Sequence, residues 1–313
     1  MSSIQTIKHK DFQWTDIHCG NGVKSKGIKH LQENFNFHPL DLDDCVSVTH
    51  RSKCDRYPFY SFLILLFPSY DKKTREINAA ELDFFISKDY LVTVHRNNDL
   101  KEFHDFFNFL NKSPEESRKF LNLPSERLLY EILNKLHISC FPMLDHISEE
   151  LDHIEKQIFA GNEKEMVHEI SIVRRNITDF RKIMQPHKNV LKKLISSLKE
   201  SPVFEIQKND VYFDNLVDYT KETWDALENY KERIEALQET NESLISFKLN
   251  DIMKILTIIS VITFPITLIA AIFGMNTPGI PFTKSAHGFW IVAGMMLLIA
   301  SLMLWHFKKR DWM

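Results

Sequence analysis

Two long apolar segments constrain this chain more than any other feature of its sequence. Residues 252–273 contain one charged side chain, Lys254, and residues 288–307 contain no Asp, Glu, Lys or Arg. About 20 apolar residues in a helix that rises ~1.5 Å per residue cross a hydrocarbon layer ~30 Å thick. Two such segments in succession, without a polar stripe, are rare inside soluble folds. The sequence therefore predicts two transmembrane helices, joined by residues 274–287.

Basic residues flank both predicted helices on the side away from residues 274–287. Lys248 and Lys254 stand at the start of the first helix, and three basic residues, 308–310, follow the second. Positive charge beside a membrane helix stays in the cytoplasm. We therefore expect a multi-pass protein of the cell (inner) membrane, with both termini cytoplasmic and residues 274–287 outside.

Composition and short motifs exclude several classes of function. The formal net charge is −3, so nothing suggests a nucleic-acid partner. The four cysteines form no CxxC pair and precede the membrane helices, so we expect reduced thiols. The chain has no P-loop, nucleophile elbow or His/Asp triad motif. We expect neither an enzyme nor a resident cofactor.

Residues 1–125 predict a cytoplasmic α/β domain. The apolar run Phe59–Phe67 lies between Pro58 and Pro68 and is too short to cross a membrane, so it is typical of a buried strand. The expected strands are Phe59–Phe67, Glu81–Ile86 and Tyr90–His95, and the expected helices that cover them are Gly27–Cys45 and Asp99–Asn111.

Residues 126–207 predict two paired amphipathic helices with an acidic tip. We place them at Leu128–Phe159 and Lys164–Leu198, with a stop at residues 161–162 and a kink at Pro186. The tip is either an ordinary solvated helix face, which is the favoured interpretation, or a surface that concentrates cations near a pore mouth. Seven acids stand there against two lysines: Asp145, Glu149, Glu150, Asp152, Glu155, Glu163 and Glu165.

Residues 208–251 predict a cytoplasmic stalk helix. No Gly or Pro occurs between Lys208 and Pro265, so the helix should run without interruption into the first membrane segment, 252–273. Its apolar residues recur at a spacing typical of a coiled coil. A stripe of this length needs partners, which favours a symmetric assembly of identical chains.

Two further groups have metal-ligand residue types. Cys45, His50 and Cys54 lack a standard zinc spacing. His146, Glu150 and His153 share a helix face, but a solvated face is the simpler interpretation.

One face of the first membrane helix carries three polar residues, Asn250, Ser260 and Thr267, among apolar ones. On a helical wheel, seven positions fall within about 120° of one another. This face carries no charge, His or Cys, so it offers little that could replace the inner water shell of a cation. Its members are Asn250, Met253, Leu256, Ser260, Phe264, Thr267 and Ala271.

The end of this helix carries the motif Gly274-Met275-Asn276. The motif follows the run from Pro265 to Phe273, and a second membrane segment begins about a dozen residues later. Together with the runs Phe35–Cys45 and Tyr90–His95, it resembles the CorA-type divalent-cation transporter family. The resemblance covers most of the chain.

The resemblance implies an α+β membrane protein that assembles as a homopentamer in the lipid bilayer and transports divalent cations. Gly274, Met275 and Asn276 would form the selectivity filter, and the seven-residue face would line the pore. Asp214 and Asp218 fall near acids that hold a regulatory metal in the family. The expected order is an N-terminal domain (1–125), paired helices (126–207), a stalk (208–251), a first transmembrane helix (252–273), an outer loop (274–287), and a second transmembrane helix with a basic cytoplasmic tail (288–313).

The chemistry of the face favours a hydrated ion. Mg²⁺ gives up water reluctantly, and amide and carbonyl oxygens at Asn276 and Gly274 can accept hydrogen bonds from its bound water. Met253 and Leu256 suit a constriction that gates by dewetting. Together with this chemistry, the resemblance implies transport of Mg²⁺, with Co²⁺ or Ni²⁺.

Two alternatives remain. The loop after Asn276 has no Asp or Glu up to His287, which resembles the zinc-transporting ZntB branch. Alternatively, the two helices could anchor a cytoplasmic interaction module.

Overall fold

The structure is a computed structural model of the chain. It describes residues 3–19, 26–47, 51–96, 99–201, 204, 210–277, 279–282 and 287–310. The chain divides into two compact units, Met1–Gln238 and Glu239–Met313.

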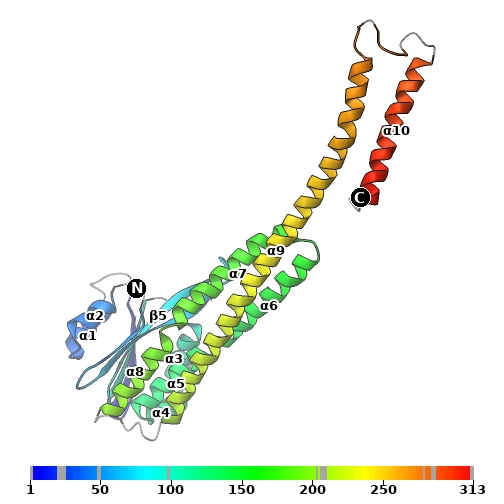
Figure 1. Cartoon of the computed structure of the whole chain (residues 1–313). Coiled ribbons are helices and arrows are strands. Elements are labelled where there is room, and N and C mark those ends of the chain that lie inside the picture. The colour runs from blue at the N-terminus through cyan, green and yellow to red at the C-terminus, as the bar shows by residue number, and fades with distance from the viewer. Residues whose placement is uncertain are drawn as a thin grey trace. The chain divides into compact units, whose positions relative to one another are not determined.

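A mixed sheet forms the centre of the first unit (Figure 1). Its six described strands lie in the order β1-β2-β6-β5-β4-β3. Neighbours pair antiparallel except β2 and β6, which run parallel with Asp16 opposite Thr93 and His18 opposite His95. The strands are β1 (Ser3–His9), β2 (Phe12–His18), β3 (Lys53–Arg56), β4 (Ser61–Asp71), β5 (Glu76–Ile86) and β6 (Tyr90–His95).

The three strands predicted from sequence are present. Tyr90–His95 is confirmed residue for residue, whereas β4 and β5 extend beyond their predicted bounds, to Asp71 and back to Glu76. These extensions form a hairpin whose turn includes Arg75, at φ 57°. β1, β2 and β3 were not predicted, because their short mixed sequences show no continuous apolar run.

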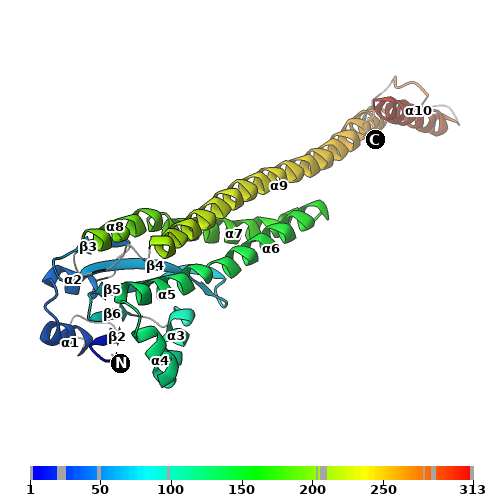
Figure 2. The same cartoon turned by 90° about the horizontal axis from the view of Figure 1, so that it is seen from below.

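Helices cover both faces of the sheet, and side chains alternate between the two cores because successive strand residues point to opposite faces. One face packs Ile17, Phe62 and Val92 against α1 (Lys26–Asn34) and α2 (Pro39–Asp44). The other packs side chains that include Trp14 and Phe84. Figure 2 shows the helices that cover this opposite side of the sheet. These helices include α3 (Lys101–Lys112), α5 (Ser125–Ile138) and α8 (His187–Glu200), and α4 (Pro114–Leu121) follows α3.

Three predicted helices are each broken in two. The helix predicted over Gly27–Cys45 is interrupted at residues 35–38, where His38 caps α2: its Nδ1 accepts the Leu40 N–H at 3.2 Å, and Pro39 occupies the first turn. The helix predicted over Leu128–Phe159 is α5 followed by α6 (Phe141–Phe159), and Pro142 again stands in the first turn.

The second paired helix is likewise α7 (Glu163–Met184) followed by α8, with Pro186 immediately before α8. Pro186 therefore separates two helices instead of kinking one. The predicted stop at residues 161–162 is confirmed, because Gly161 adopts φ 95° between α6 and α7.

The last two described helices are α9 (Asp210–Phe273) and α10 (Gly288–Lys309). The unbroken helix predicted up to Phe273 is confirmed over the described residues, and Pro265 lies inside it. Phe213 and Leu216 of α9 join the core of the first unit. Farther along, Arg233 of α9 donates to Asp152 and Glu155 of α6, at 2.6 Å each.

The second unit has a different surface. Both of its helices contain a stretch long and apolar enough to cross a membrane, and almost none of either stretch is buried. Large side chains such as Leu268, Leu297 and Trp305 are more than half exposed. This is the surface expected of helices that lie in a bilayer.

Candidate pore segment and a buried histidine–aspartate cluster

All seven residues of the predicted pore face lie on α9, and all seven are exposed in the single chain. Phe264 is 73% exposed, Met253 60% and Leu256 53%. A run of apolar and weakly polar side chains on one helix face is thus left open for lipid, water or another chain.

The hydroxyl groups on this face have a defined orientation. Ser260 Oγ donates to the Leu256 carbonyl at 2.8 Å, and Thr267 Oγ1 donates to the Thr263 carbonyl at 2.9 Å. Each hydroxyl hydrogen is therefore used within the helix, and only the oxygen lone pairs remain available. Such oxygens accept hydrogen bonds from water, including water bound to a cation.

The Gly-Met-Asn motif stands where α9 ends. The Gly274 N–H donates to the Ala270 carbonyl at 2.9 Å and the Met275 N–H to the Ile272 carbonyl at 3.3 Å, so the helical pattern ends here. Asn276 follows outside the helix and is exposed. A Cβ at Gly274 would lie 3.0 Å from the Ala270 oxygen, so any larger residue would crowd this turn.

The loop beyond the motif folds against the start of α10. Phe282 adopts φ 67°, a costly conformation for an aromatic residue. A Cβ at Gly288 would lie 2.2 Å from the Phe282 carbonyl oxygen, so position 288 accepts only glycine without a shift of the loop. A cavity of about 370 Å³ lies between Phe273, Gly274 and the first turns of α10.

The acids predicted to hold a regulatory metal are exposed on α9. Asp214 and Asp218 are one turn apart, and the neighbouring Asn215 lies 3.4 Å from the Tyr130 hydroxyl. Their metal role stays a prediction.

Two other sequence candidates fail as metal sites. Cys45 and Cys54 belong to the cores on opposite faces of the sheet, and burial raises the pKa of the Cys54 thiol to about 12. His50 lies outside the described residues. His146 lies 3.8 Å from Glu150, but Glu150 is instead held by Arg75 at 2.9 Å.

The acidic tip is partly neutralised by ion pairs. Arg75 bridges Glu150 and Glu169, and its guanidinium lowers the pKa of Glu169. Arg233 similarly pairs with Asp152 and Glu155. These pairs reduce the charge available to attract cations and favour the interpretation as a mostly structural helix face.

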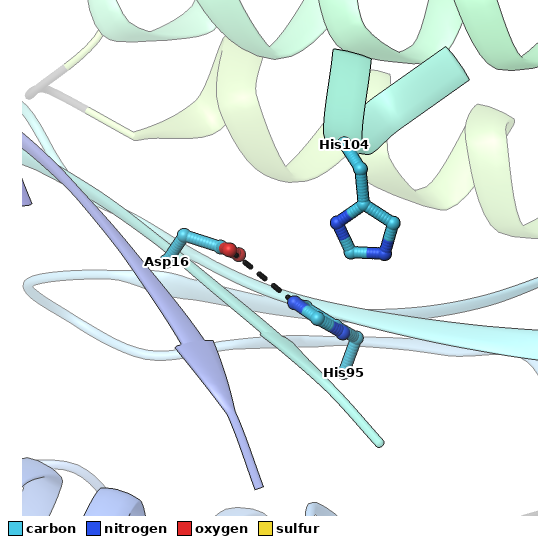
Figure 3. Close-up of side chains that lie close together, drawn as sticks. All are labelled: Asp16, His95 and His104. Atoms are coloured by element: carbon cyan, nitrogen blue, oxygen red, sulfur yellow. Dashed lines mark hydrogen bonds and ion pairs between the residues drawn. The ribbon is translucent and has the colours of Figure 1, made fainter. Parts of the chain in front are cut away.

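A converging group of metal-type ligands lies elsewhere, at the edge of the sheet core. Asp16, His95 and His104 each offer one ligand atom, and these atoms lie within 4.8 Å of one another (Figure 3). Sequence reasoning missed this group because the residues lie on β2, β6 and α3. The available signal was that the runs Trp14–His18 and Tyr90–His95 both end in histidine, but only the pairing of β2 with β6 brings them together.

Comparison with known proteins decides the family. The family model described as "CorA-like Mg2+ transporter protein" matches residues 9–309, nearly the whole chain. The chain belongs to this family. Its members are transporters, so this CorA-like protein is not an enzyme, and it transports metal ions across a membrane.

Individual relatives agree with this assignment. The cobalt/magnesium transport protein CorA of Thermotoga maritima is 29% identical over 288 residues, covering 91% of this chain and 80% of the relative. The CorA magnesium transporter structure from Methanocaldococcus jannaschii superposes with a TM-score of 0.81 at 23% identity, covering 98% of this chain and 94% of that chain.

The fold of the first unit also occurs in a ZntB protein. The cytoplasmic domain of ZntB from Vibrio parahaemolyticus has a TM-score of 0.59 at 13% identity, covering 75% of this chain and 88% of that domain. The predicted fold class, an N-terminal α/β domain with a long helix and two apolar C-terminal helices, is confirmed.

Proposed function

We propose that this CorA-like protein conducts hydrated Mg²⁺, with Co²⁺ or Ni²⁺ as further substrates, through a pore formed by several copies of α9. The observation that carries the proposal is Gly274-Met275-Asn276 at the end of α9, directly beyond a helix face without charge. Cobalt and magnesium appear in the name of the Thermotoga relative, which supports the choice of ions.

A central pore requires an assembly of identical chains. The face from Asn250 to Ala271 is exposed in one chain, and apolar residues on the other sides of α9 are exposed as well. In a symmetric ring, one side of each α9 faces the axis and the others face neighbours or lipid. The family resemblance suggests five copies.

The filter acts on the water shell of the ion. Asn276 would contribute one amide oxygen per chain, and Gly274 one carbonyl. Amide and carbonyl oxygens can accept hydrogen bonds from bound water without replacing it, which suits an ion that dehydrates as reluctantly as Mg²⁺. Ser260 and Thr267 present lone pairs farther along the path, because their hydrogens are bonded to the helix backbone.

The gate would lie at Met253 and Leu256. Both are apolar, exposed on the proposed pore face and one turn apart. A ring of such side chains excludes water when it is narrow, which closes a pore without any plug. The basic residues around the membrane segments support a cytoplasmic position for this end of the pore, with residues 274–287 outside.

Zinc is the second candidate substrate. The loop from Thr277 to His287 has no acid, and the ZntB domain shares the fold of the first unit. The pore face lacks the nitrogen and sulfur ligands that bare Zn²⁺ prefers, so zinc would also have to pass hydrated.

Ion flux into liposomes that contain the purified protein tests the proposal. Asn276→Ala removes the amide ring but changes nothing in the helices, and we expect it to reduce Mg²⁺ flux at least tenfold. Asn276→Asp should also depress flux, because a site that binds too tightly releases its ion slowly. Gly274→Ala should do so by crowding the Ala270 carbonyl.

Thr277→Ala, next to the motif, is the matched control and should transport normally. Insertion and assembly of every variant are checked by mass in detergent. If Asn276→Ala transports like the wild type, the proposed filter role of Asn276 is wrong, and the interpretation of the two membrane helices as an anchor is favoured. Faster Zn²⁺ than Mg²⁺ flux would select the zinc alternative, and a monomer in detergent would exclude the ring.

A further inference from the structure

The pairing of two strands builds a polar corner in the first unit. β2 and β6 run parallel, with Asp16 opposite Thr93 and His18 opposite His95. Residues two apart point to the same face, so Asp16 and His95 stand diagonally across the two strands on the side that faces α3. The first turns of α3 bring His104 over them (Figure 3).

The distances suit a common bound ion. Asp16 Oδ2 and His95 Nε2 lie 3.2 Å apart, and one ligand atom from each of the three residues lies within 4.8 Å of the others. Two ligands bound to a tetrahedral zinc-type ion at ~2.0–2.2 Å are separated by about 3.4 Å. The first two ligands are therefore already spaced for binding, and His104 needs a small side-chain movement to complete the set.

Neighbouring side chains fix the orientation of the carboxylate. Trp14 Nε1 donates to Thr93 Oγ1 at 3.2 Å, and Thr93 Oγ1 donates to Asp16 Oδ1 at 2.7 Å. This chain of hydrogen bonds occupies Oδ1 and turns Oδ2 toward His95. Trp14 and Thr93 are fully buried, and Asp16 and His95 are 8% and 4% exposed. Such support is characteristic of protein metal sites, where outer groups hold the ligands in place.

We propose that Asp16, His95 and His104 bind a divalent transition-metal ion of the zinc, cobalt and nickel class. Two imidazole nitrogens and one carboxylate oxygen suit these ions, whereas Mg²⁺ prefers an all-oxygen shell. The site belongs to the first unit and uses none of the proposed pore residues. It therefore does not depend on the proposed conduction path.

The surroundings leave room for a water ligand. A cavity of about 290 Å³ opens beside the cluster and is lined also by Gln5, His18 and Lys101. A water molecule takes up ~30 Å³ in the liquid, so the cavity can supply a fourth ligand. The exposed Lys101 ammonium at the rim works against a cation and sets an upper limit on its affinity.

Binding of Co²⁺ to the full chain in detergent tests this inference. The protein is stripped with a chelator, saturated with Mg²⁺ to fill oxygen sites, and titrated with Co²⁺. We expect one Co²⁺ per chain that resists Mg²⁺, is displaced by Zn²⁺, and shows the strong visible absorption of low-coordinate cobalt. Bound Co²⁺ should also raise the melting temperature.

Three variants and two controls decide the outcome. His104 is the least buried of the three residues. His104→Gln replaces it with a neutral side chain of similar volume and should weaken Co²⁺ binding at least tenfold. Asp16→Asn should weaken it by a similar factor. Thr93→Val removes only the support of Asp16 and should weaken binding by ~10–100-fold. His168→Gln, an exposed histidine on α7, should bind Co²⁺ like the wild type.

Asn276→Ala should also keep the Co²⁺ signal, which separates this site from the proposed pore. His104→Gln is the deciding variant if Asp16→Asn does not fold, and its metal-free melting curve is compared with that of the wild type. Unchanged Co²⁺ affinity in His104→Gln, or absorption typical of fully hydrated cobalt, would overturn the inference.

Discussion

The two units of this transporter differ in how their polar side chains are hydrogen-bonded and in how far their apolar side chains are buried. In the first unit, many buried or half-buried polar groups have partners within the same chain: Tyr57 and Tyr60 donate to Asp41, and Asn176 accepts the Ile77 N–H. In the second unit, hydroxyl groups such as Ser260 bond to their own helix, and most apolar side chains are exposed.

This difference shows which unit depends on its environment. The first buries an extensive core around Phe84 and Leu133, both fully inaccessible. The second buries little: Ile258, 7% exposed, is its one buried large apolar side chain among the described residues. The first unit can therefore be stable as a single chain, whereas the second needs a bilayer and neighbouring copies.

The sharpest test compares the same substitution in both units. Phe84 is fully buried and Phe264 is 73% exposed. Phe84→Ala should lower the free energy of unfolding of the first unit by about 3–5 kcal/mol, because it leaves a cavity. Phe264→Ala should leave that unfolding unchanged, although it can alter flux. Denaturant titrations in detergent measure the free energy of unfolding of both variants. An equal loss of stability in both would contradict the proposed difference between the two units.

Two buried histidines should make only the first unit sensitive to acid. His187 Nε2 lies 2.7 Å from the Leu66 carbonyl and His137 Nδ1 2.8 Å from the Leu133 carbonyl. Burial lowers the pKa of His137 to about 4; burial and the neighbouring His137 lower the pKa of His187 to about 3.

The direction of this effect follows from proton binding. Below pH ~6.5 the unfolded chain protonates these histidines, whereas the folded chain does not. Stability therefore falls as pH drops from about 6.5 toward 4, by about 3 kcal/mol for His137 alone. His137→Gln should flatten the pH dependence of unfolding, whereas His168→Gln, at an exposed site, should not; parallel curves for all three proteins would contradict this.

Hydration of the proposed gate should change flux without changing stability. Met253→Asp places a carboxylate on the exposed, proposed pore face and should admit water to the gate. The leak flux of ions should then rise roughly tenfold for each ~1.4 kcal/mol by which the free-energy barrier to ion passage is lowered. Met253→Leu keeps the site apolar and serves as the control. Liposome flux of correctly assembled protein is the measurement, and lower or unchanged leak in Met253→Asp would place the gate elsewhere.

The smallest effect is expected at a surface contact of the first unit. Arg233 is 31% exposed and pairs with Asp152 and Glu155. Arg233→Gln should lower the free energy of unfolding of the first unit by about 0–1 kcal/mol, because water weakens exposed ion pairs. The loss should be smaller at high salt, because dissolved ions screen the charges further. A loss comparable to that of Phe84→Ala would show that this contact between α9 and α6 is as important as the core.

The sequence predicted best where the local signal was long and uniform. The second apolar helix was predicted to start at Gly288 and does so, and α9 ends at Phe273 as predicted. The break before α6 was missed and the break before α8 was interpreted as a kink. Pro142 lies in the first turn of α6 and Pro186 immediately before α8, and the spacing of apolar residues does not distinguish such a helix start from a kink in one longer helix.

Features that depend on pairing between distant segments could not be read from the sequence. Asp16 and His95 are 79 residues apart, and only the parallel register of β2 and β6 places them together. Likewise, nothing local to Asp152 or Glu155 indicates that Arg233, far along the chain, neutralises them. The predicted pore residues could be grouped from the sequence because they repeat along one helix, where spacing alone defines a face.

Pro265, inside α9, sets a condition on where this helix can reside. A proline has no N–H, so the Val261 carbonyl lacks the donor that every ordinary helical residue would give it. The hydroxyl hydrogens of Thr263 and Thr267 are already bonded elsewhere, to the Ile259 and Thr263 carbonyls. An unpaired carbonyl immersed in hydrocarbon costs several kcal/mol, so α9 is disfavoured as a solitary, lipid-coated rod. Because this one N–H donor is missing, α9 requires water or a neighbouring chain to hydrogen-bond the Val261 carbonyl within the membrane, independently of any ion.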